Sequence, residues 1–295
     1  MSQKNTTPLF FLTPAIILII VFVIYPIVQT LWISFLSPKG EFVGLRNYAQ
    51  ILRSKEIINS DRFPFECPPW GALIHNAVWI AIHLPLTVFL GLFFAIILKD
   101  VKGASIIKSI VFLGMVMPMV VGGLMAKFLF DKDVGIVNVV LRFIGLHSLA
   151  DISWTYHPET ALFATILIGV WMWTGFSMIV YSAALAAIPR EYYEAAEIDG
   201  ASSFRKFIHI TLPLLKPATL VVVVMTVLWE LKIFDIVYVA TGGGPGEASM
   251  VLAILMYIKA FVAFNFSEAA VLATLLTLLT LLPAIWIAKT AVGRK

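Results

Sequence analysis

From Ile188 to Pro217 the sequence reads IPREYYEAAEIDGASSFRKFIHITLPLLKP, a polar stretch between two long apolar segments. Pro189 suits the first turn of a helix, because its missing N–H would lack a helical partner there in any case. Gly200 suits the left-handed conformation that stops a helix. A second short helix can follow, and Pro213 is expected to end it. The pattern predicts two short helices joined at a sharp glycine corner.

The two predicted helices differ in charge. Acidic side chains at Glu191, Glu194 and Glu197 are biased toward the positive N-terminal end of the first helix. Either Ser202 or Ser203 can cap the second helix, which carries basic residues. We therefore expect an ordered segment, acidic on its first helix and basic on its second, and not a flexible tether.

One face of the first helix is small. Ala195 and Ala196 would let another protein approach the helix closely. An ordered loop of this kind at a membrane surface suits a docking element. The alternative is a pair of interfacial helices lying on lipid headgroups, and the residues alone leave both interpretations open.

The chain as a whole has the composition of a membrane protein. Of its 295 residues, 60% are hydrophobic and 13% are charged, and the mean hydropathy is +0.96, whereas a soluble domain is about half apolar and a quarter charged. A helix needs roughly 20 apolar residues to cross a bilayer core. Six segments meet this condition, at about Leu9–Phe35, Ala72–Leu98, Ile106–Phe130, Ala161–Ile188, Ala218–Ala240 and Ala269–Ala288. The predicted fold is an all-α membrane protein, a bundle of six transmembrane helices without a soluble domain.

The basic residues indicate topology. The net charge of +4 does not suggest nucleic-acid binding, because the basic residues lie at the ends of apolar runs. The loops and ends on one side of the membrane have roughly twice the Lys and Arg density of the other side. This denser set comprises Lys4, Lys99, Lys102, Lys108, Arg190, Arg205, Lys206, Lys216, Lys289, Arg294 and Lys295. Both termini and the Ile188–Pro217 stretch are therefore predicted to be cytoplasmic, in a multi-pass protein of the cell membrane.

The N-terminal apolar run contains no charge between Lys4 and Lys39. It is too long for the apolar region of a signal peptide and lacks a small-x-small cleavage site, which favours a retained first helix over a cleaved signal. The single cysteine, Cys67, cannot form an internal disulfide, and one thiol is not enough to form a metal site.

A spaced pattern runs through the predicted corner. It consists of Glu194-Ala195-Ala196, three residues, Gly200, nine residues, Ile210, one residue and Leu212-Pro213. This pattern resembles the EAA loop of the permeases of binding-protein-dependent ABC importers. Further along, the stretch from Phe234 to Pro245 resembles the segment before the last helix in the maltose and glycerol-phosphate branch of that family. The resemblance covers about residues 71–288, the expected permease domain with its coupling loop at 189–213, whereas residues 1–70 match only in general form.

The resemblance implies a type I ABC importer-like bundle and a role in carbohydrate import. In that family the EAA loop sits in a cleft of a cytoplasmic ATP-binding subunit, so Glu194 would make the polar contact, Ala195 and Ala196 the close packing, and Gly200 the corner. The implied partners are two cytoplasmic ATP-binding subunits, a second, related permease and an extracytoplasmic sugar-binding protein. ATP and Mg would be bound by the partner subunits and no cofactor by this chain, which has no G-x-x-x-x-G-K-[ST] sequence.

Charged residues inside the predicted spans need a reason, since each costs about 2.5–3.5 kcal/mol on insertion scales. Glu230, Lys232 and Asp235 cluster in the predicted fifth helix, near the depth at which transporters commonly bind substrate. Lys232 and Asp235, three residues apart, can neutralise each other, which leaves Glu230 as the better sugar ligand. The resembling permeases carry amides at about this depth, so the charged residues here leave the identity of the sugar open.

The predicted fourth helix supplies aromatic rings and hydroxyls. Trp173, Ser177 and Tyr181 are candidates for the substrate path, because aromatic rings stack on sugar rings and hydroxyls bond to their edges. The alternative for each is ordinary helix packing, with Gly169 and Gly175 allowing close approach.

Two other functions are weighed against an importer permease. An ion- or proton-coupled secondary transporter would use Glu230, Lys232 and Asp235, but it gives the glycine corner no role. An intramembrane enzyme using His75, His83 and Asp235 lacks any catalytic spacing, so no catalytic residue is predicted. With no nearby carboxylate, His75 and His83 make a poor metal site, and we expect buried, hydrogen-bonded histidines.

Overall fold

The structure is a computed structural model that describes residues 7–99 and 101–292. The regular structure of these residues is helical, apart from one isolated bridge between Leu36 and Phe42. Five helical stretches are long and apolar enough to cross a bilayer, or six if one bent pair counts as a single span. The predicted all-α bundle with six apolar segments is therefore confirmed.

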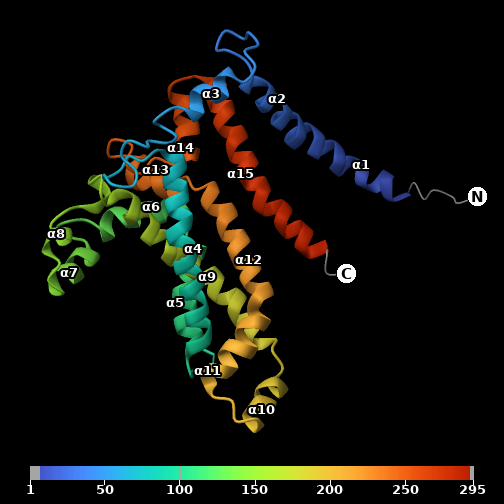
Figure 1. Cartoon of the computed structure of the whole chain (residues 1–295), viewed down its shortest axis with the longest axis vertical. Helices are drawn as coiled ribbons and strands as arrows, with labels where there is room; N and C mark the ends of the chain where they lie inside the picture. The colour runs from blue at the N-terminus through green and yellow to red at the C-terminus, as the bar shows by residue number, and fades with distance from the viewer. Residues whose placement is uncertain (1–6, 100, 293–295) are drawn as a thin grey trace, which may run out of the picture.

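The helices follow one another as Figure 1 shows. Their bounds are α1 Thr7–Ile19, α2 Tyr25–Ser34, α3 Arg46–Leu52, α4 Ala72–Ile97, α5 Ala104–Val116, α6 Met119–Leu129, α7 Ile136–Phe143, α8 His147–Ala150, α9 Ala161–Ala186, α10 Arg190–Ile198, α11 Ser203–Lys206, α12 Leu212–Leu231, α13 Asp235–Thr241, α14 Leu252–Tyr257 and α15 Phe266–Val292. Short π-helical or 3₁₀ pieces lie at Ile20–Ile24, Trp154–Tyr156, Phe207–Thr211 and Ile258–Val262.

The centre of the bundle is the contact of α9 with α4, beside which α5 and α12 pack. Small residues allow this approach. A Cβ added at Gly91 of α4 would lie 2.4 Å from the Cβ of Ser177 on α9, and one at Gly175 of α9 would lie 2.8 Å from the Cα of Phe112 on α5. Backbones that come this close gain van der Waals contact, which is the main attraction between helices in lipid. The close approach expected at Gly175 is confirmed.

The first span leaves the bundle. α1 and α2 extend to one side in Figure 1, and α2 packs on α15. Every side chain from Phe11 to Gln29 is exposed. This long apolar surface requires lipid or another helix to cover it.

The third span is bent. The sequence predicts one helix over Ile106–Phe130, but α5 and α6 meet at 105°. The break falls at Met117 and Pro118, both of which have extended backbone. A proline disfavours helical conformation in the residue before it and cannot donate to the previous turn, so the interruption has a local cause.

The fifth span is displaced from its predicted place, Ala218–Ala240. The helix runs without a break from Ser203 through the π-helical turn Phe207–Thr211 to Leu231, so the prediction that Pro213 ends a short helix is wrong. A π-helical turn changes the hydrogen-bond pattern of the backbone. It therefore accommodates the following proline, which has no N–H group to donate to the previous turn. The chain then loses helical structure at 232–234 before α13 begins.

Two local features order the loops at the end of the molecule that carries α3 and α14. A glycine-rich turn follows α13, where Gly242 and Gly243 have φ of +63° and +89°. The ammonium group of Lys259 lies 2.8 Å from a carboxylate oxygen of Glu56 and 3.0 Å from one of Glu268. Burial alone would lower the pKa of Lys259, but the hydrogen bonds to the two glutamates outweigh it and raise that pKa. This ion cluster ties the loop between α3 and α4 to the start of α15.

Candidate functional site

The glycine corner forms at the end of the molecule opposite α3 and α14 (Figure 1). No residue of α10 is buried. The helix ends with two main-chain bonds: Gly200 N–H donates to the carbonyl of Glu197 at 3.0 Å, and Ala201 N–H donates to that of Ala196 at 2.8 Å. Gly200 has φ of +73°, a conformation that costs other residues energy. The predicted glycine stop is confirmed.

Side chains fix the corner to the bundle. The hydroxyls of Tyr193 on α10 and Thr211, just before α12, lie 2.9 Å apart. The ammonium group of Lys99, which follows α4, lies 5.4 Å from the centre of the Tyr193 ring, within the range of a cation–π contact. Lys206 of α11 forms an ion pair with Glu197 of α10 at 2.5 Å. These contacts connect α10 to the end of α4 and to the start of α12.

Sequence reasoning missed part of this arrangement. Tyr193 and Thr211 are not recognisable as a pair from their spacing, whereas the opposite charges of the two helices pointed toward the Glu197–Lys206 contact. Of the two candidate capping residues, Ser202 takes the role, because its Oγ accepts the N–H of Arg205 at 3.4 Å.

The residues expected to contact another protein are accessible. Glu194 and Ala195 are exposed and Ala196 is half-buried. Within the described part of the chain, Glu194 has no hydrogen-bond or ion-pair partner. Ile198, at the tip of α10, is 88% exposed. The tip combines a free carboxylate with small and apolar side chains, a composition that suits a protein contact more than contact with water alone.

Glu230 lies inside the subunit and does not face an open path. Only 1% of it is exposed, and one of its carboxylate oxygens pairs with Nδ1 of His83 on α4. Asn76 of α4 donates to the main-chain carbonyl of Glu230 at 3.2 Å and accepts the N–H of Leu252 at 2.9 Å. These contacts hold the end of α12 and the start of α14 against α4.

The histidines are buried and hydrogen-bonded, as expected. His75 Nε2 accepts the N–H of Trp70 at 3.0 Å, and its Nδ1 lies 2.7 Å from the carbonyl of Met250, which places the ring proton on Nδ1. The expectation that no carboxylate lies near is wrong for His83, because Glu230, 147 residues away in the sequence, lies beside it. The described residues contain no group of three or more His, Cys, Asp or Glu placed to hold a metal.

A cavity of about 190 Å³ lies at the bend between α5 and α6. Its wall consists of Met115, Met117, Met119, Met172, Trp173 and Trp229. The two indole rings are 5.5 Å apart, edge to face. Of the residues predicted for the substrate path, Trp173 lines this cavity. Ser177 packs on Gly91, and the hydroxyl of Tyr181 donates to Thr219 at 3.1 Å, contacts that agree with the packing alternative.

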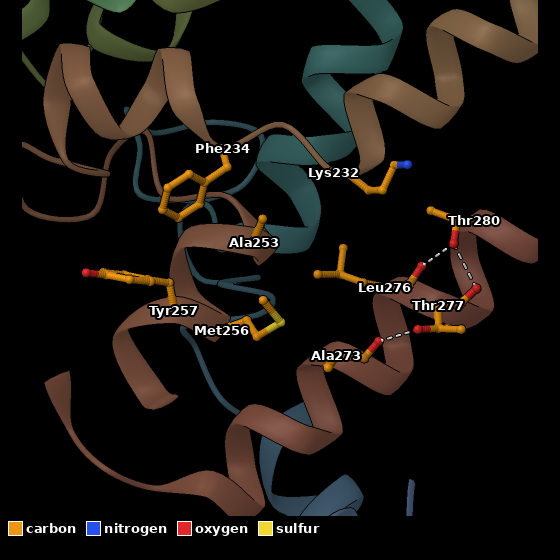
Figure 2. A pocket seen from close by; sticks show the side chains of 9 residues that line it. All are labelled: Lys232, Phe234, Ala253, Met256, Tyr257, Ala273, Leu276, Thr277 and Thr280. Atoms are coloured by element: carbon orange, nitrogen blue, oxygen red, sulfur yellow. Dashed lines mark hydrogen bonds between the residues drawn. The ribbon is translucent and has the colours of Figure 1, made fainter. Parts of the chain in front are cut away.

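Lys232 and Asp235 do not form the predicted pair. The helix ends at Leu231, so the two residues no longer lie on one helix, and no ion pair joins them in the described structure. Lys232 borders a cavity of about 430 Å³, between the end of α12, α14 and α15, whose wall includes Phe234 and Tyr257 (Figure 2). The six predicted substrate-path residues therefore do not share one cavity.

Comparisons with known proteins agree with this architecture. A family model described as the inner membrane component of binding-protein-dependent transport systems matches residues 87–294. The chain is 58% identical over 289 residues to a probable ABC transporter permease of Pyrococcus horikoshii, covering 97% of this chain and 99% of that protein. It is 34% identical over 250 residues to a trehalose/maltose transport system permease of Thermococcus litoralis, covering 83% and 80% of the two chains. A subunit of a bacterial ABC transporter that imports the acidic polysaccharide alginate has a similar fold, with a TM-score of 0.77, 20% identity and coverage of 99% and 97%.

Proposed function

The chain belongs to the family of binding-protein-dependent transport system inner membrane components, and on that basis we propose that it is the permease subunit of an ATP-driven sugar importer. The names of its relatives support a sugar, since one of them serves trehalose and maltose transport. The observation that carries the proposal is the corner at Gly200, an exposed helix tied to two spans. A helix held in this way can transmit force from a bound partner protein to the two spans.

The proposed mechanism is alternating access driven from outside the chain. One of two cytoplasmic ATP-binding subunits would contact Glu194, Ala195 and Ala196, and the two subunits together would supply the bound ATP and Mg. Because Tyr193 and Lys206 tie the corner to the spans, closure of those subunits would rock α4 and α12. This chain would then contribute no catalytic step of its own.

Solute would pass along the cavity at the bend between α5 and α6. Trp173 and Trp229 offer aromatic faces to the apolar side of a sugar ring, while the surrounding methionines adapt to its shape. Glu230 would act indirectly, through His83, with which it pairs. The ring centre of His83 lies 5.6 Å from that of Trp173 in the cavity wall.

Two further partners are proposed, a second permease and a sugar-binding protein. A second, related permease is supported by the exposed surface from Phe11 to Gln29, which another subunit or lipid would cover. An extracytoplasmic sugar-binding protein would deliver solute at the end opposite α10. With this orientation, the corner and both termini would lie in the cytoplasm. Of the basic residues that favour this orientation, Lys4, Arg294 and Lys295 lie outside the described residues.

The proposal is tested with Ala195→Trp in the complete transporter, reconstituted with its sugar-binding protein. A large side chain on the small face of α10 should cost about 1–3 kcal/mol at a close contact, and we expect sugar uptake to fall at least about tenfold. The measurement is ATP-dependent uptake of labelled maltose and trehalose.

Ala187→Trp is the matched control, since Ala187 is an exposed alanine just after α9 and outside the corner. It should retain uptake. Full uptake by Ala195→Trp, or sugar uptake by this chain without ATP or partner subunits, would contradict the proposal.

A further inference from the structure

Helix α7 turns its apolar side outward. Ile136, Val139, Val140 and Phe143 recur at the spacing of one helical face, and all four are exposed, Phe143 to 91%. On the opposite face Asn138 is fully buried. A surface helix of a soluble protein has the reverse arrangement, with its apolar stripe against the core.

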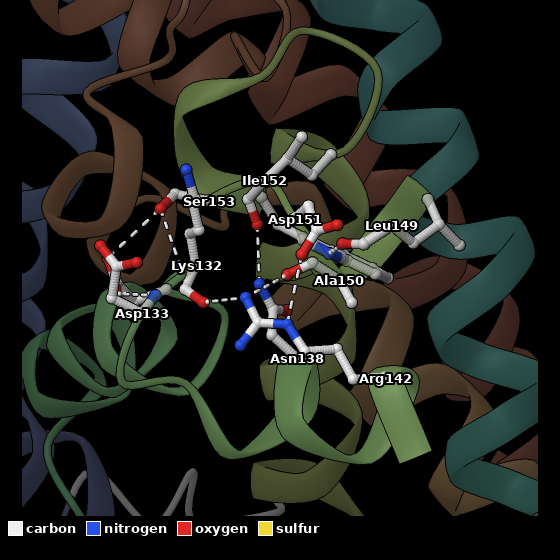
Figure 3. A network of polar contacts seen from close by, with 11 residues as sticks. Lys132, Asp133, Asn138, Arg142, Leu149, Ala150, Asp151, Ile152 and Ser153 are labelled. Carbon is white, nitrogen blue, oxygen red and sulfur yellow. Dashed lines mark hydrogen bonds and ion pairs between the residues drawn. The ribbon is translucent and has the colours of Figure 1, made fainter. Parts of the chain in front are cut away.

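The face of α7 opposite the stripe carries Asn138 and Arg142, which fix it to the segments before and after the helix (Figure 3). Asn138 Nδ2 donates to the carbonyl of Ile152 at 2.7 Å. The Arg142 guanidinium donates to the carboxylate of Asp151 at 3.2 Å and to the carbonyl of Lys132 at 2.9 Å. The helix cannot roll its apolar stripe inward without breaking these bonds, so the exposed stripe is built into the fold.

The turn that leads into α7 is also fixed. The carboxylate of Asp131 accepts the N–H groups of Asp133 at 2.9 Å and Val134 at 3.1 Å, and the Ser153 hydroxyl at 3.2 Å. The two backbone N–H groups lower the pKa of Asp131, which favours the charged carboxylate that accepts these hydrogen bonds.

Helix α7 lies next to a membrane-spanning segment. The helix lies in sequence between α6 and α9, on the side of the membrane opposite the glycine corner. α6 belongs to the bent span and exposes Val120, Leu124 and Phe128, and α7 packs against α6. The exposed stripe of α7 therefore belongs to a helix that packs against a span with exposed apolar side chains of its own.

We propose that α7 is an interfacial helix whose apolar stripe is covered by the acyl chains and headgroup boundary of the outer leaflet. The four exposed side chains of the stripe include no polar group. A transient contact with a soluble binding protein is only about as apolar as an average protein surface, whereas an interfacial helix has a wholly apolar face directed into lipid. The helix would then fix the outer end of the bent span to the membrane surface.

Spin labels in the complete transporter, held in lipid nanodiscs, test this assignment. Cys67 is the sole cysteine of the sequence and is exposed, so Cys67→Ser gives a background for single labels. Labels at Phe143→Cys and Val139→Cys should collide several-fold more often with oxygen than with a water-soluble nickel chelate. Labels at Asp133→Cys and His147→Cys, exposed polar positions at either end of α7, should show the reverse order.

Three results would overturn the proposal. Frequent collision with the nickel chelate at Phe143 would place the stripe in water. An immobilised label that neither reagent reaches would indicate packing on another permease subunit. Immobilisation that appears only when the binding protein is added would indicate a docking face. If Phe143→Cys fails to assemble, Val140→Cys reports on the same stripe.

Discussion

Replacing Gly200 with valine is expected to abolish ATP-driven uptake while leaving the subunit in the membrane. Gly200 has φ of +73°, and no atom lies within 4 Å of the position that a Cβ would take. The substitution therefore meets no steric obstacle, and its effect comes from the backbone. A left-handed conformation costs an ordinary residue about 1–2 kcal/mol, and a β-branched residue is a worse case.

The expected loss follows from what the corner holds. If Gly200→Val relaxes the backbone, α10 changes direction, and the Tyr193–Thr211 and Glu197–Lys206 contacts separate. Hydrolysis by the ATP-binding subunits should continue, whereas uptake should fall by an order of magnitude or more, since each 1.4 kcal/mol is a factor of about ten. The measurement is the ratio of sugar molecules imported to ATP molecules hydrolysed.

Two control variants distinguish a specific role of the corner from a general effect of backbone strain. Gly200→Asn should retain most uptake, because asparagine tolerates the left-handed conformation. Gly103→Val introduces the same kind of strain in the connection that precedes α5, where φ is +79° and the space is also open. Uptake at the wild-type level in Gly200→Val, or an equal loss in Gly103→Val, would contradict a specific coupling role.

His83→Ala is expected to destabilise the subunit more than any change at an exposed ion pair. The substitution leaves the carboxylate of Glu230 buried without its partner. Breaking a buried pair in this way costs about 3–5 kcal/mol, which corresponds to a fall of roughly 10 °C in the midpoint of thermal unfolding. The measurement is the unfolding midpoint of the purified transporter.

Matched variants identify the cause. His83→Ala combined with Glu230→Gln removes the unpaired charge and should recover part of the loss. Asp61→Asn breaks the exposed Lys55–Asp61 pair, whose side chains are 73% and 65% exposed, and should shift the midpoint little. An unchanged midpoint in His83→Ala would show that the pair does not stabilise the fold.

The sequence predicts most of the helices because transmembrane segments need long apolar runs, and it predicts the corner because a helix stop needs a residue like Gly200. It does not predict the end of α12 at Leu231, since no proline or glycine lies between Leu231 and Gly242 to mark a break. Pro118 is visible in the sequence, but the 105° bend depends on how α6 packs against α13.

The interior contacts are harder to predict. His83 and Glu230 lie on different helices, 147 residues apart, and no periodicity connects them. Their approach follows from the small residues that bring α4 and α9 together and from Asn76, which binds the end of α12. For the same reason, the sequence places Trp173 on the correct helix but does not predict that Trp173 and Lys232 border different cavities.

The most direct test of docking at the corner is recovery of the tagged chain from mildly solubilised native membranes, with its partners quantified by mass spectrometry. We expect an ATP-binding subunit and a second permease to be recovered with the wild-type chain. The ATP-binding subunit should be lost when Glu194→Ala and Gly200→Val are combined, while the second permease is retained. Recovery of the chain alone from membranes that take up sugar, or equal recovery of the ATP-binding subunit with the double variant, would contradict docking at the corner.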